Sequence, residues 1–554
     1  MNDIYLNNKF YAKEAIEQAL EDFSDICKGE IINEDFQVRL YTDKEVPSLE
    51  DEFLNYVLGL MKNEGLEEQK ATEEFLEEEP PKKDSKTNKA KKGFTKNFFR
   101  KKKIGDYYLI TTETGDWIIL SKKEFNLFKQ DNEEKDEKLL KKLLEKNILI
   151  DKNNLKQCIN KYANRKSFLK RGASLHIVVL SLRCDIRCKY CQTSSKPNSS
   201  KGYDMTKDTA KKVVDKIFES PSKDITIEFQ GGEPLLNFET LKFMVETAKK
   251  KNENKNKNLR FSLVTNLVNM TDEKLKFLTD NKIPICTSLD GPEDVHNKTR
   301  QSHHKVTKWI KKIQKMHKEG KTGNPPHALL TVARAQLEKP NEIVDEYINQ
   351  GLRGVHLRGI SKLGVAKKNE SEIYYSAEEF IEFWKKAMDY ILDINKKGKS
   401  FIERKTLIIL KKIFSDIDPN YLDLRSPCGA VIGQLLYNYD GRIYSCDEGR
   451  MLGEDDIFNI GTVDDFYKDY TTSPISCAII ASSINDTQYC DKCVFKPYCG
   501  LCPVMNYSES GSLICNVPSS DWCKIHYAQF EYIFNKLIDP ETKDILESWA
   551  KENK

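Results

Sequence analysis

The 554-residue sequence lacks a long apolar run, and it lacks an excess of charge of one sign. No run approaches the roughly eighteen apolar residues that indicate a membrane-spanning helix, and the first residues lack the basic head and apolar stretch of a signal peptide. Lysine plus arginine (89) nearly balances aspartate plus glutamate (86), so no global field attracts nucleic acid or a membrane surface. We therefore expect a cytoplasmic protein that binds neither.

Cysteine, by contrast, is abundant. The sequence has fifteen, and in a reducing compartment they indicate metal or redox sites more than disulfide bonds. Cys184, Cys188 and Cys191 form a C-x3-C-x2-C motif directly after the apolar run LHIVVLSL. Three thiolates can hold three irons of a cubane cluster and leave the fourth iron open to a small ligand. A partial zinc knuckle is the alternative, although zinc normally takes four protein ligands.

Apolar runs alternate with amphipathic segments six times between about residues 174 and 400. The runs are LHIVVLSL, ITIEF, RFSLVT, IPICTSL, HALLTVA and GVHLRGI, each followed by a helix-like stretch such as TAKKVVDKIF. Strands alternating with helices predict a parallel sheet, and six such units correspond to three-quarters of a (β/α)8 barrel. We therefore expect an α/β fold centred on a partial (β/α)6 barrel of the TIM type.

Polar residues and glycines follow these runs. In chain order they are Cys184, Gly231-Gly232-Glu233-Pro234, Thr265-Asn266, Ser288 with Asp290, Arg334, and Arg358. Chemistry in parallel barrels collects at the carboxyl ends of the strands, which lie on one rim. We therefore expect these residues to surround a single site.

Two small α+β modules are predicted before the barrel. The first combines a helical pattern at Ala15–Phe23, an alternating run at Phe36–Leu40 and a second helix from Ser48. In the second, two β runs flank a Thr-Gly-Asp turn, Ser121 and Glu124 indicate a helix start, and LLKKLLEKNILI predicts a further helix. Strands followed by helices suggest a winged-helix module.

These patterns divide the chain into six segments. They are a small α+β domain (1–65), a charged linker (66–94), a winged-helix-like module (95–166), the (β/α)6 core (167–405), a cysteine-rich domain (420–530) and a C-terminal helix (531–554).

A second cysteine series occupies the C-terminal region. It comprises Cys428, Cys446, Cys490, Cys493, Cys499, Cys502, Cys515 and Cys523, and four of these form C-x2-C-x5-C-x2-C. That spacing predicts a metal-binding domain, for which a zinc ribbon is the main alternative to an iron–sulfur site.

The chain resembles the radical S-adenosylmethionine (SAM) enzymes in three features. These are the first cysteine motif, Tyr190 before its third cysteine, and GGEP after the second strand. The resemblance implies that Cys184, Cys188 and Cys191 bind a 4Fe-4S cluster whose open iron chelates the amino and carboxylate groups of SAM. An electron from the cluster would then break a carbon–sulfur bond and release a 5′-deoxyadenosyl radical.

The same resemblance implies which residues contact SAM. Gly231, Gly232 and Glu233 match the stretch that receives the methionine amine, since a glycine pair admits close approach of a ligand and a carboxylate accepts from an ammonium. For all the candidates, a purely structural role is the alternative. The remaining candidates are Tyr190 for the adenine, Thr265, Asn266, Ser288 and Asp290 for ribose or carboxylate, and Arg358 at the end of the sixth strand.

The second cysteine series resembles SPASM, a C-terminal domain with two auxiliary Fe-S clusters that occurs on radical SAM enzymes modifying peptides and proteins. The implied ligands are Cys428, Cys446 and Cys502 for one 4Fe-4S cluster, and Cys490, Cys493, Cys499 and Cys523 for the other. The common pattern of this domain has three residues between these two cysteines, whereas this sequence has two between Cys499 and Cys502. The sequence therefore does not specify the fourth ligand of the first cluster. Cys477 or Cys515 could supply it, or the site could stay open for substrate.

Longer segments carry a closer resemblance. Over about residues 95–540 the chain looks like the B-type radical SAM maturase of His-Xaa-Ser peptide-modification systems. The segments that carry this resemblance are CDIRCKYCQTSS, EFQGGEPLLNFE, SPCGAVIGQLLYNYDGRIYSCDEGRM and CVFKPYCGLCPV. Residues 1–65 look like the D-type companion protein of these systems, fused in front. The hairpin at 107–120 resembles edge-strand modules that hold leader peptides, with a structural wing as the alternative.

These resemblances imply an enzyme that abstracts hydrogen from a ribosomally made precursor peptide or small protein, supplied with electrons by a donor such as flavodoxin or ferredoxin. The sequence specifies neither a catalytic residue nor the bond that is made. One alternative is an anaerobic sulfatase-maturase-like oxidase, which converts a cysteine or serine side chain to formylglycine. Another is a non-catalytic iron–sulfur or zinc protein.

Overall fold

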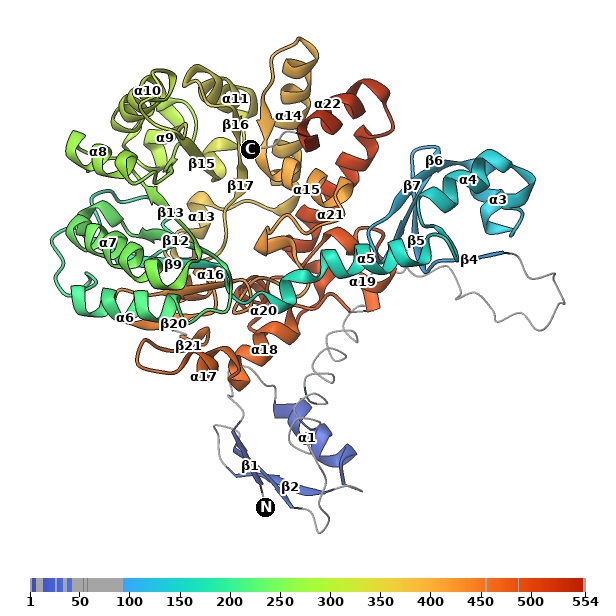
Figure 1. The fold of residues 1–554 in the computed structure, drawn as a ribbon, viewed down its shortest axis with the longest axis horizontal. Helices are drawn as coiled ribbons and strands as arrows, with labels where there is room; N and C mark the ends of the chain where they lie inside the picture. Colours follow the sequence, from blue (N-terminus) through green and yellow to red (C-terminus); the bar gives the residue numbers. More distant parts are fainter. Residues whose placement is uncertain are drawn as a thin grey trace. The chain divides into compact units, whose positions relative to one another are not determined.

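The computed structural model describes residues 2–5, 13–24, 27–32, 37–41, 53, 57, 93–453, 456–486 and 488–551. They belong to two compact units, Met1–Gly93 with Cys502–Ser520, and Phe94–Leu501 with Asp521–Lys554, whose elements are labelled in Figure 1. The predicted linker lies outside the described residues up to position 92, as does most of the helix predicted from Ser48.

The first unit contains an antiparallel sheet of order β1-β3-β2. Its elements are β1 (Asn2–Tyr5), α1 (Lys13–Asp22), β2 (Lys28–Ile31), β3 (Gln37–Tyr41) and α20 (Pro503–Ser510). The predicted helix and alternating strand are both present: Ile16 and Ala19 are buried on α1, and Val38 and Leu40 are buried on β3. An α+β pattern is therefore confirmed for the described part of this segment.

The second unit begins with a small module. Its elements are β4 (Phe94–Lys96), β5 (Phe99–Ile104), β6 (Tyr107–Thr112), β7 (Trp117–Ser121), α3 (Lys122–Lys129), α4 (Glu137–Glu145), β8 (Leu149–Asp151) and α5 (Leu155–Arg165). Ser121 and Glu124 form the predicted capping box at the start of α3. The leucine-rich stretch is helical only as far as Glu145, because Leu149–Asp151 pairs with β4 instead. The single helix predicted there is wrong in its second half.

A parallel sheet forms the centre of the second unit (Figure 1). Its six core strands are β9 (Leu175–Ser181), β12 (Asp224–Gly231), β13 (Asn258–Thr265), β14 (Ile285–Ser288), β15 (His327–Val332) and β17 (Leu357–Gly359). They lie in chain order, and each is parallel to the next. The six predicted strands are therefore confirmed, and their carboxyl ends share one edge.

Helices connect these strands or follow the last of them. They are α6 (Lys207–Ile217), α7 (Phe238–Lys255), α8 (Asp272–Asp280), α9 (Glu293–Thr299), α10 (His303–Lys318), α11 (Pro340–Asn349), α12 (Val365–Lys368), α13 (Glu370–Ile373), α14 (Ala377–Lys396) and α15 (Arg404–Phe414). The amphipathic pattern explains their packing: α6 buries Ala210, Val213, Val214 and Ile217, which share one helical face. β9 is almost wholly buried, as expected for an interior parallel strand covered on both faces.

The C-terminal region extends the same sheet. β19 (Gln434–Tyr437) lies parallel to β9, and β20 (Arg442–Tyr444) and β21 (Asn459–Thr462) add antiparallel strands beyond it. The helices are α16 (Asp447–Met451), α17 (Tyr467–Thr471), α18 (Pro474–Ser482), α19 (Gln488–Lys492), α21 (Asp521–Lys536) and α22 (Pro540–Lys551). The remaining short strands are β10 (Arg183–Cys184), β11 (Lys196–Pro197), β16 (Gly354–Val355) and β18 (Ile402–Glu403).

Hydrogen bonds attach the N-terminal module of this unit to its other segments. The Thr111 hydroxyl donates to the Val494 carbonyl at 2.7 Å, and Trp117 Nε1 donates to the Ile413 carbonyl at 3.3 Å. These bonds connect the three-stranded sheet to the last turn of α15 and to the segment that follows α19. In the part of the chain that the structure describes, no helix combines the length and apolar character needed to span a bilayer.

Candidate radical SAM site

The C-x3-C-x2-C motif occupies the loop after β9. Cys184 is buried, while Cys188 and Cys191 are half-buried. The loop is pinned at its far end, where the Cys191 carbonyl accepts from the Val365 N–H at 2.9 Å. The Cys184 and Cys188 thiols, and the Cys188 and Cys191 thiols, lie close enough to interact electrostatically. The fold therefore brings the three predicted ligands together.

Each motif sulfur has a side-chain donor within hydrogen-bonding distance. The pairs are Asn266 Nδ2 with Cys184 at 3.6 Å, Arg300 Nη1 with Cys188 at 3.6 Å, and the Thr193 and Ser195 hydroxyls with Cys191, both at 3.3 Å. N–H and O–H groups aimed at sulfur favour the thiolate, which is the form that binds metal. This donor set therefore fits a cluster held by three thiolates.

The three thiols differ in acidity. Burial raises the pKa of Cys184 to about 12 and the pKa of Cys188 to about 11. Burial acts on Cys191 in the same direction, but hydrogen bonds from Ser195 and Thr193 outweigh it and its pKa falls below the usual value. Metal binding at Cys184 and Cys188 would therefore release protons.

Gly231 and Gly232 pack against the backbone that leads into the cysteine motif. Gly231 has a φ of +142°, and a Cβ atom there would lie 2.1 Å from the Ser181 carbonyl oxygen. A Cβ atom on Gly232 would lie 2.4 Å from the Arg183 carbonyl oxygen. The Gly-Gly pair was expected to admit a ligand. In the structure the space of their missing side chains is taken by protein backbone.

Glu233 is fully buried and accepts three hydrogen bonds. Its Oε1 accepts from the Leu235 N–H at 2.9 Å and the Thr265 hydroxyl at 2.7 Å, and its Oε2 accepts from the Asn266 N–H at 2.8 Å. Burial nevertheless raises the pKa of Glu233 to about 7. A carboxylate has about four acceptor sites, so one remains for a further donor. Thr265 and Asn266 hold this carboxylate in place.

Tyr190 and Asp290 lie in one buried network. The Tyr190 hydroxyl donates to Asp290, and Arg300 Nε donates to both the Tyr190 oxygen (2.6 Å) and the Asp290 carboxylate (2.8 Å). The Thr299 hydroxyl and the Thr331 N–H also donate to that carboxylate, each at 3.2 Å. Protein donors therefore satisfy Asp290, which favours its structural role over a contact with ribose.

Ser288 ends its strand and Arg358 is the next-to-last residue of its strand, on the same edge as the cysteine loop. Ser288 is the last residue of β14 and is half-buried. Arg358 Nη2 lies 3.1 Å from Glu448 Oε1, on α16. Burial raises the pKa of Glu448 to about 7, and Asp423 raises it further while Arg358 opposes the shift. Arg358 thus connects the last core strand to the helix that follows Cys446.

Four of the C-terminal cysteines are gathered in the second unit. Burial raises the pKa of Cys499 well above its usual range, and the neighbouring thiols of Cys523, Cys490 and Cys493 raise it further. These are the four implied ligands of one auxiliary cluster. Within the described ranges, no three His, Cys, Asp or Glu side chains are grouped around a single-ion site. Thiolates of a cubane bind separate irons and stand farther apart.

The other auxiliary set is divided between the units. Cys428 and Cys446 are buried in the second unit, where the Val431 N–H donates to the Ser445 carbonyl at 3.0 Å and joins their two loops. Cys477 lies exposed on α18. Cys502 and Cys515 belong to the first unit.

The sequence motifs do not indicate which side chains donate to the motif sulfurs. Thr193 and Ser195 lie within the segment CQTSS, so hydroxyls next to the third cysteine were an available signal. Arg300 belongs to no motif. It reaches Cys188 and Asp290 because the turn after α9 returns to the cysteine loop, where the Lys189 N–H donates to the Thr299 carbonyl.

Comparison with known proteins identifies the class of this domain. Residues 178–332, from within β9 to the end of β15, match the family model described as the Radical SAM superfamily. This part of the chain is therefore a radical SAM domain.

Individual relatives cover different shares of the chain. The radical SAM cyclopropyl synthase TigE of Paramaledivibacter caminithermalis is 31% identical over 150 residues, which is 25% of this chain and 31% of that protein. A cysteine-type anaerobic sulfatase-maturating enzyme of Clostridium perfringens is 24% identical over 379 residues, or 66% of this chain and 97% of the enzyme. The solved structure of anSMEcpe with bound AdoMet aligns with a TM-score of 0.57 at 21% identity, covering 68% of this chain and 99% of that one. This likeness shows a shared fold.

Proposed function

We propose that this protein is a cytoplasmic radical SAM enzyme that abstracts hydrogen from a ribosomally made peptide or protein. The main support is an arrangement within a radical SAM domain. The three cysteines after β9 lie beside the Gly-Gly-Glu stretch at the end of the adjacent strand β12. In this proposal the six parallel strands form the (β/α)6 core, 420–530 is an auxiliary-cluster domain of the SPASM type, and 95–166 recognises the peptide.

The residues present fit a 4Fe-4S cluster and SAM. When bound, this pair supplies a carbon-centred radical through reductive cleavage of SAM. Cys184, Cys188 and Cys191 would hold the cluster, and their N–H and O–H donors stabilise the thiolate form. Glu233 would use its remaining acceptor site for the ammonium of SAM. Such a cation would restore the carboxylate form that burial disfavours.

The proposed substrate is a precursor peptide or small protein. Support comes from the relatives, since the Clostridium perfringens enzyme is named for maturation of a sulfatase and anSMEcpe was solved with the peptide Cp18Cys. We extend the proposal to the B-type maturase of a His-Xaa-Ser system with a fused D-type companion at residues 1–65. An electron donor such as flavodoxin or ferredoxin would supply the reducing equivalent. The two auxiliary clusters would bind the peptide directly or carry away the electron left after hydrogen abstraction.

Anaerobic reconstitution tests the core of this proposal. Purified protein with iron, sulfide, SAM and dithionite should form 5′-deoxyadenosine and methionine, and Cys188→Ala should abolish both products. Cys158→Ala is the matched control, because Cys158 is buried on α5 outside the motifs and should leave the cleavage intact. Absence of both products from iron-loaded wild-type protein would favour a non-catalytic iron–sulfur or zinc protein.

A second candidate is a formylglycine-generating oxidase of the sulfatase-maturase type. The match to the sulfatase-maturating enzyme over 97% of its length favours it. Coexpression with a sulfatase-derived peptide and with short open reading frames next to the gene, followed by mass spectrometry, distinguishes the two. Conversion of cysteine to formylglycine supports the oxidase, whereas another mass change in a neighbouring peptide supports the proposed maturase.

A further inference from the structure

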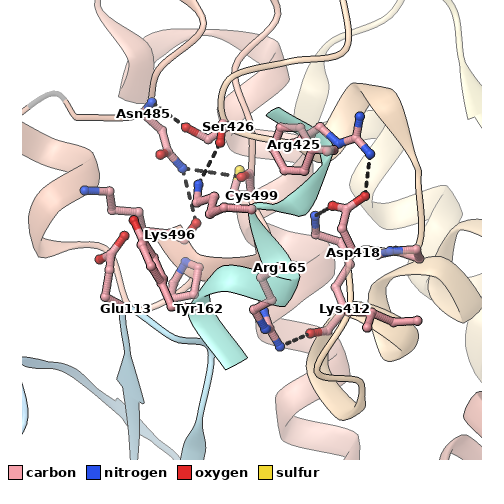
Figure 2. Close-up of a pocket in the computed structure, with 15 residues that line it drawn as sticks. Glu113, Tyr162, Arg165, Lys412, Asp418, Arg425, Ser426, Asn485, Lys496 and Cys499 are labelled. Carbon is pink, nitrogen blue, oxygen red and sulfur yellow. Dashed lines mark hydrogen bonds and ion pairs between the residues drawn. The ribbon is translucent and has the colours of Figure 1, made fainter. Parts of the chain in front are cut away.

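A basic pocket lies in the second unit, where α5, the segment after α15 and the segment before Cys499 approach one another (Figure 2). Its cavity volume is about 40 Å³. Five of its lining side chains are basic and two are acidic. The basic residues are Arg165, Lys166, Lys412, Arg425 and Lys496, and the acidic ones are Glu113 and Asp418.

Some of this positive charge is neutralised within the pocket wall. Lys496 pairs with Asp486 at 2.7 Å and with Asp491 at 2.5 Å. Arg425 Nη2 pairs with Asp418 at 2.6 Å. Of the two acidic lining residues, Asp418 is therefore held by Arg425, and Glu113 is held by Arg100, whose Nη2 lies 2.7 Å from Glu113 Oε2.

Arg165 and Lys166 are held differently, by uncharged groups. Arg165 Nη2 donates to the Lys412 carbonyl at 2.7 Å and to the Ser415 carbonyl at 2.9 Å, and Lys166 Nζ donates to the Ser426 carbonyl at 2.7 Å. Backbone carbonyls orient a cation without cancelling its charge. Burial lowers the pKa of Lys166, while the nearby carboxylates of Glu113, Asp486 and Asp418 oppose this shift.

Two buried donors of the pocket are unsatisfied. The Nε atoms of Arg165 and Arg425 have no hydrogen-bond partner among the described residues, and Arg425 is only 3% exposed. A buried N–H without a partner carries a desolvation penalty that an incoming oxygen would relieve. Both arginines are lining residues of the pocket in Figure 2, so an anion that enters it would approach these donors.

An apolar stripe leads to the same pocket. Leu155, Ile159 and Tyr162 share one face of α5 and are 50%, 60% and 42% exposed, although the outer face of a surface helix is normally polar. Tyr162 and Ile417, which is 61% exposed, also line the pocket. Exposed apolar residues grouped next to an excess of basic side chains indicate a binding surface for a partner that is apolar on one side and acidic on the other.

We propose that this stripe and pocket bind an acidic, amphipathic segment of the peptide substrate, with apolar side chains on α5 and a carboxylate beside Arg165 and Lys166. The inference rests on the proposed function and specifies the class of peptide that it requires. It places recognition at α5 rather than at the hairpin of β6 and β7. Lys412 is paired inside the wall, where its Nζ lies 4.0 Å from Asp418 Oδ2.

Fluorescence anisotropy with two labelled peptides tests this proposal. The probe is a twelve-residue peptide of alternating Leu-Leu and Glu-Glu pairs, and its counterpart has glutamine in place of every glutamate. The reconstituted full-length protein should bind the acidic probe at least about tenfold more tightly, because a charge-assisted hydrogen bond contributes that much. The difference should shrink as salt is added.

Variants locate the binding site. Lys166→Glu should weaken binding of the acidic probe at least about tenfold, and Ile159→Ser should weaken binding of both peptides. Lys170→Glu is the matched control, since Lys170 is exposed, lies on the same segment and is not a lining residue. Equal affinity for the two peptides, or equal loss in Lys166→Glu and Lys170→Glu, would overturn the proposal.

SAM cleavage without peptide separates this inference from the proposed function. Wild-type protein that cleaves SAM but does not distinguish the probes overturns the binding site alone, whereas protein that binds the acidic probe without cleaving SAM supports the site and overturns the enzyme. Normal probe binding by Lys166→Glu with slower reduction by flavodoxin would also overturn the proposal, and would assign the pocket to an acidic electron donor.

Discussion

Removal of the Arg300 guanidinium should destabilise the radical SAM domain more than removal of an exposed arginine. The Asp290 side chain is 0% exposed and Arg300 Nε lies 2.8 Å from it, so Arg300→Met leaves a buried carboxylate without its cation. Breaking one partner out of a buried pair costs about 3–5 kcal/mol. Arg300→Met also removes the hydrogen bond to the Tyr190 hydroxyl, which belongs to the same network. We therefore expect the free energy of unfolding to fall by about 3–5 kcal/mol.

Urea denaturation of the anaerobic, iron-loaded protein measures this effect, with aromatic fluorescence as the signal. Arg334→Met is the control, because its ion pair with Glu379 has side chains 49% and 45% exposed and should contribute less than about 1 kcal/mol. The double variant Arg300→Met with Asp290→Asn should recover part of the loss, since it removes the unpaired charge. Equal destabilisation by Arg300→Met and Arg334→Met, or additive losses in the double variant, would refute this reasoning.

Three further variants test other parts of the structure. Burial lowers the pKa of His176 to about 3, so its neutral form stabilises the fold above about pH 6.5, and this contribution decreases as the pH falls toward 3. Between pH 8 and pH 5.5, the free energy of unfolding of His176→Gln should therefore fall by about 1.4 kcal/mol less than that of the wild type, as measured by urea denaturation. An equal fall in the two proteins would contradict this. Gly231→Ala should lower iron content because its Cβ would meet the Ser181 carbonyl, whereas Gly202→Ala, also at positive φ but in open space, should retain iron. Cys493→Ala should abolish peptide modification yet leave uncoupled SAM cleavage, and equal loss of both activities would argue against a separate auxiliary cluster.

The strands and the cysteine loop could be predicted from sequence because they depend on local patterns. An apolar run such as LHIVVLS can be buried on both faces only inside a sheet, and C-x3-C-x2-C places three sulfurs on one short loop. The helix start at Ser121 likewise follows from a capping box within four residues. The end of α4 did not follow, because Leu149–Asp151 leaves the helical pattern to pair with β4, far away in sequence.

The donors to the motif sulfurs depend on long-range contacts and could not be predicted in the same way. Asn266 was identified from its position after the third strand, but as a SAM contact, and the structure places its Nδ2 on Cys184 and on Asp185. Arg300 has no local signature, and only the return of the chain after α9 brings it to Cys188. Long-range polar networks of this kind require the fold before they can be recognised.

The Gly-Gly-Glu stretch has two roles that an activity assay alone would confuse. The two glycines set the approach of β12 to the backbone before Cys184, while Glu233 is held by Thr265 and Asn266 with one acceptor site remaining. Glu233→Gln keeps the size of the side chain but gives one of its ends N–H donors, so it should weaken SAM binding. Iron content and SAM affinity must therefore be measured separately. If Glu233 serves SAM, Glu233→Gln keeps its iron and loses affinity, whereas a purely structural Glu233 would lose both together.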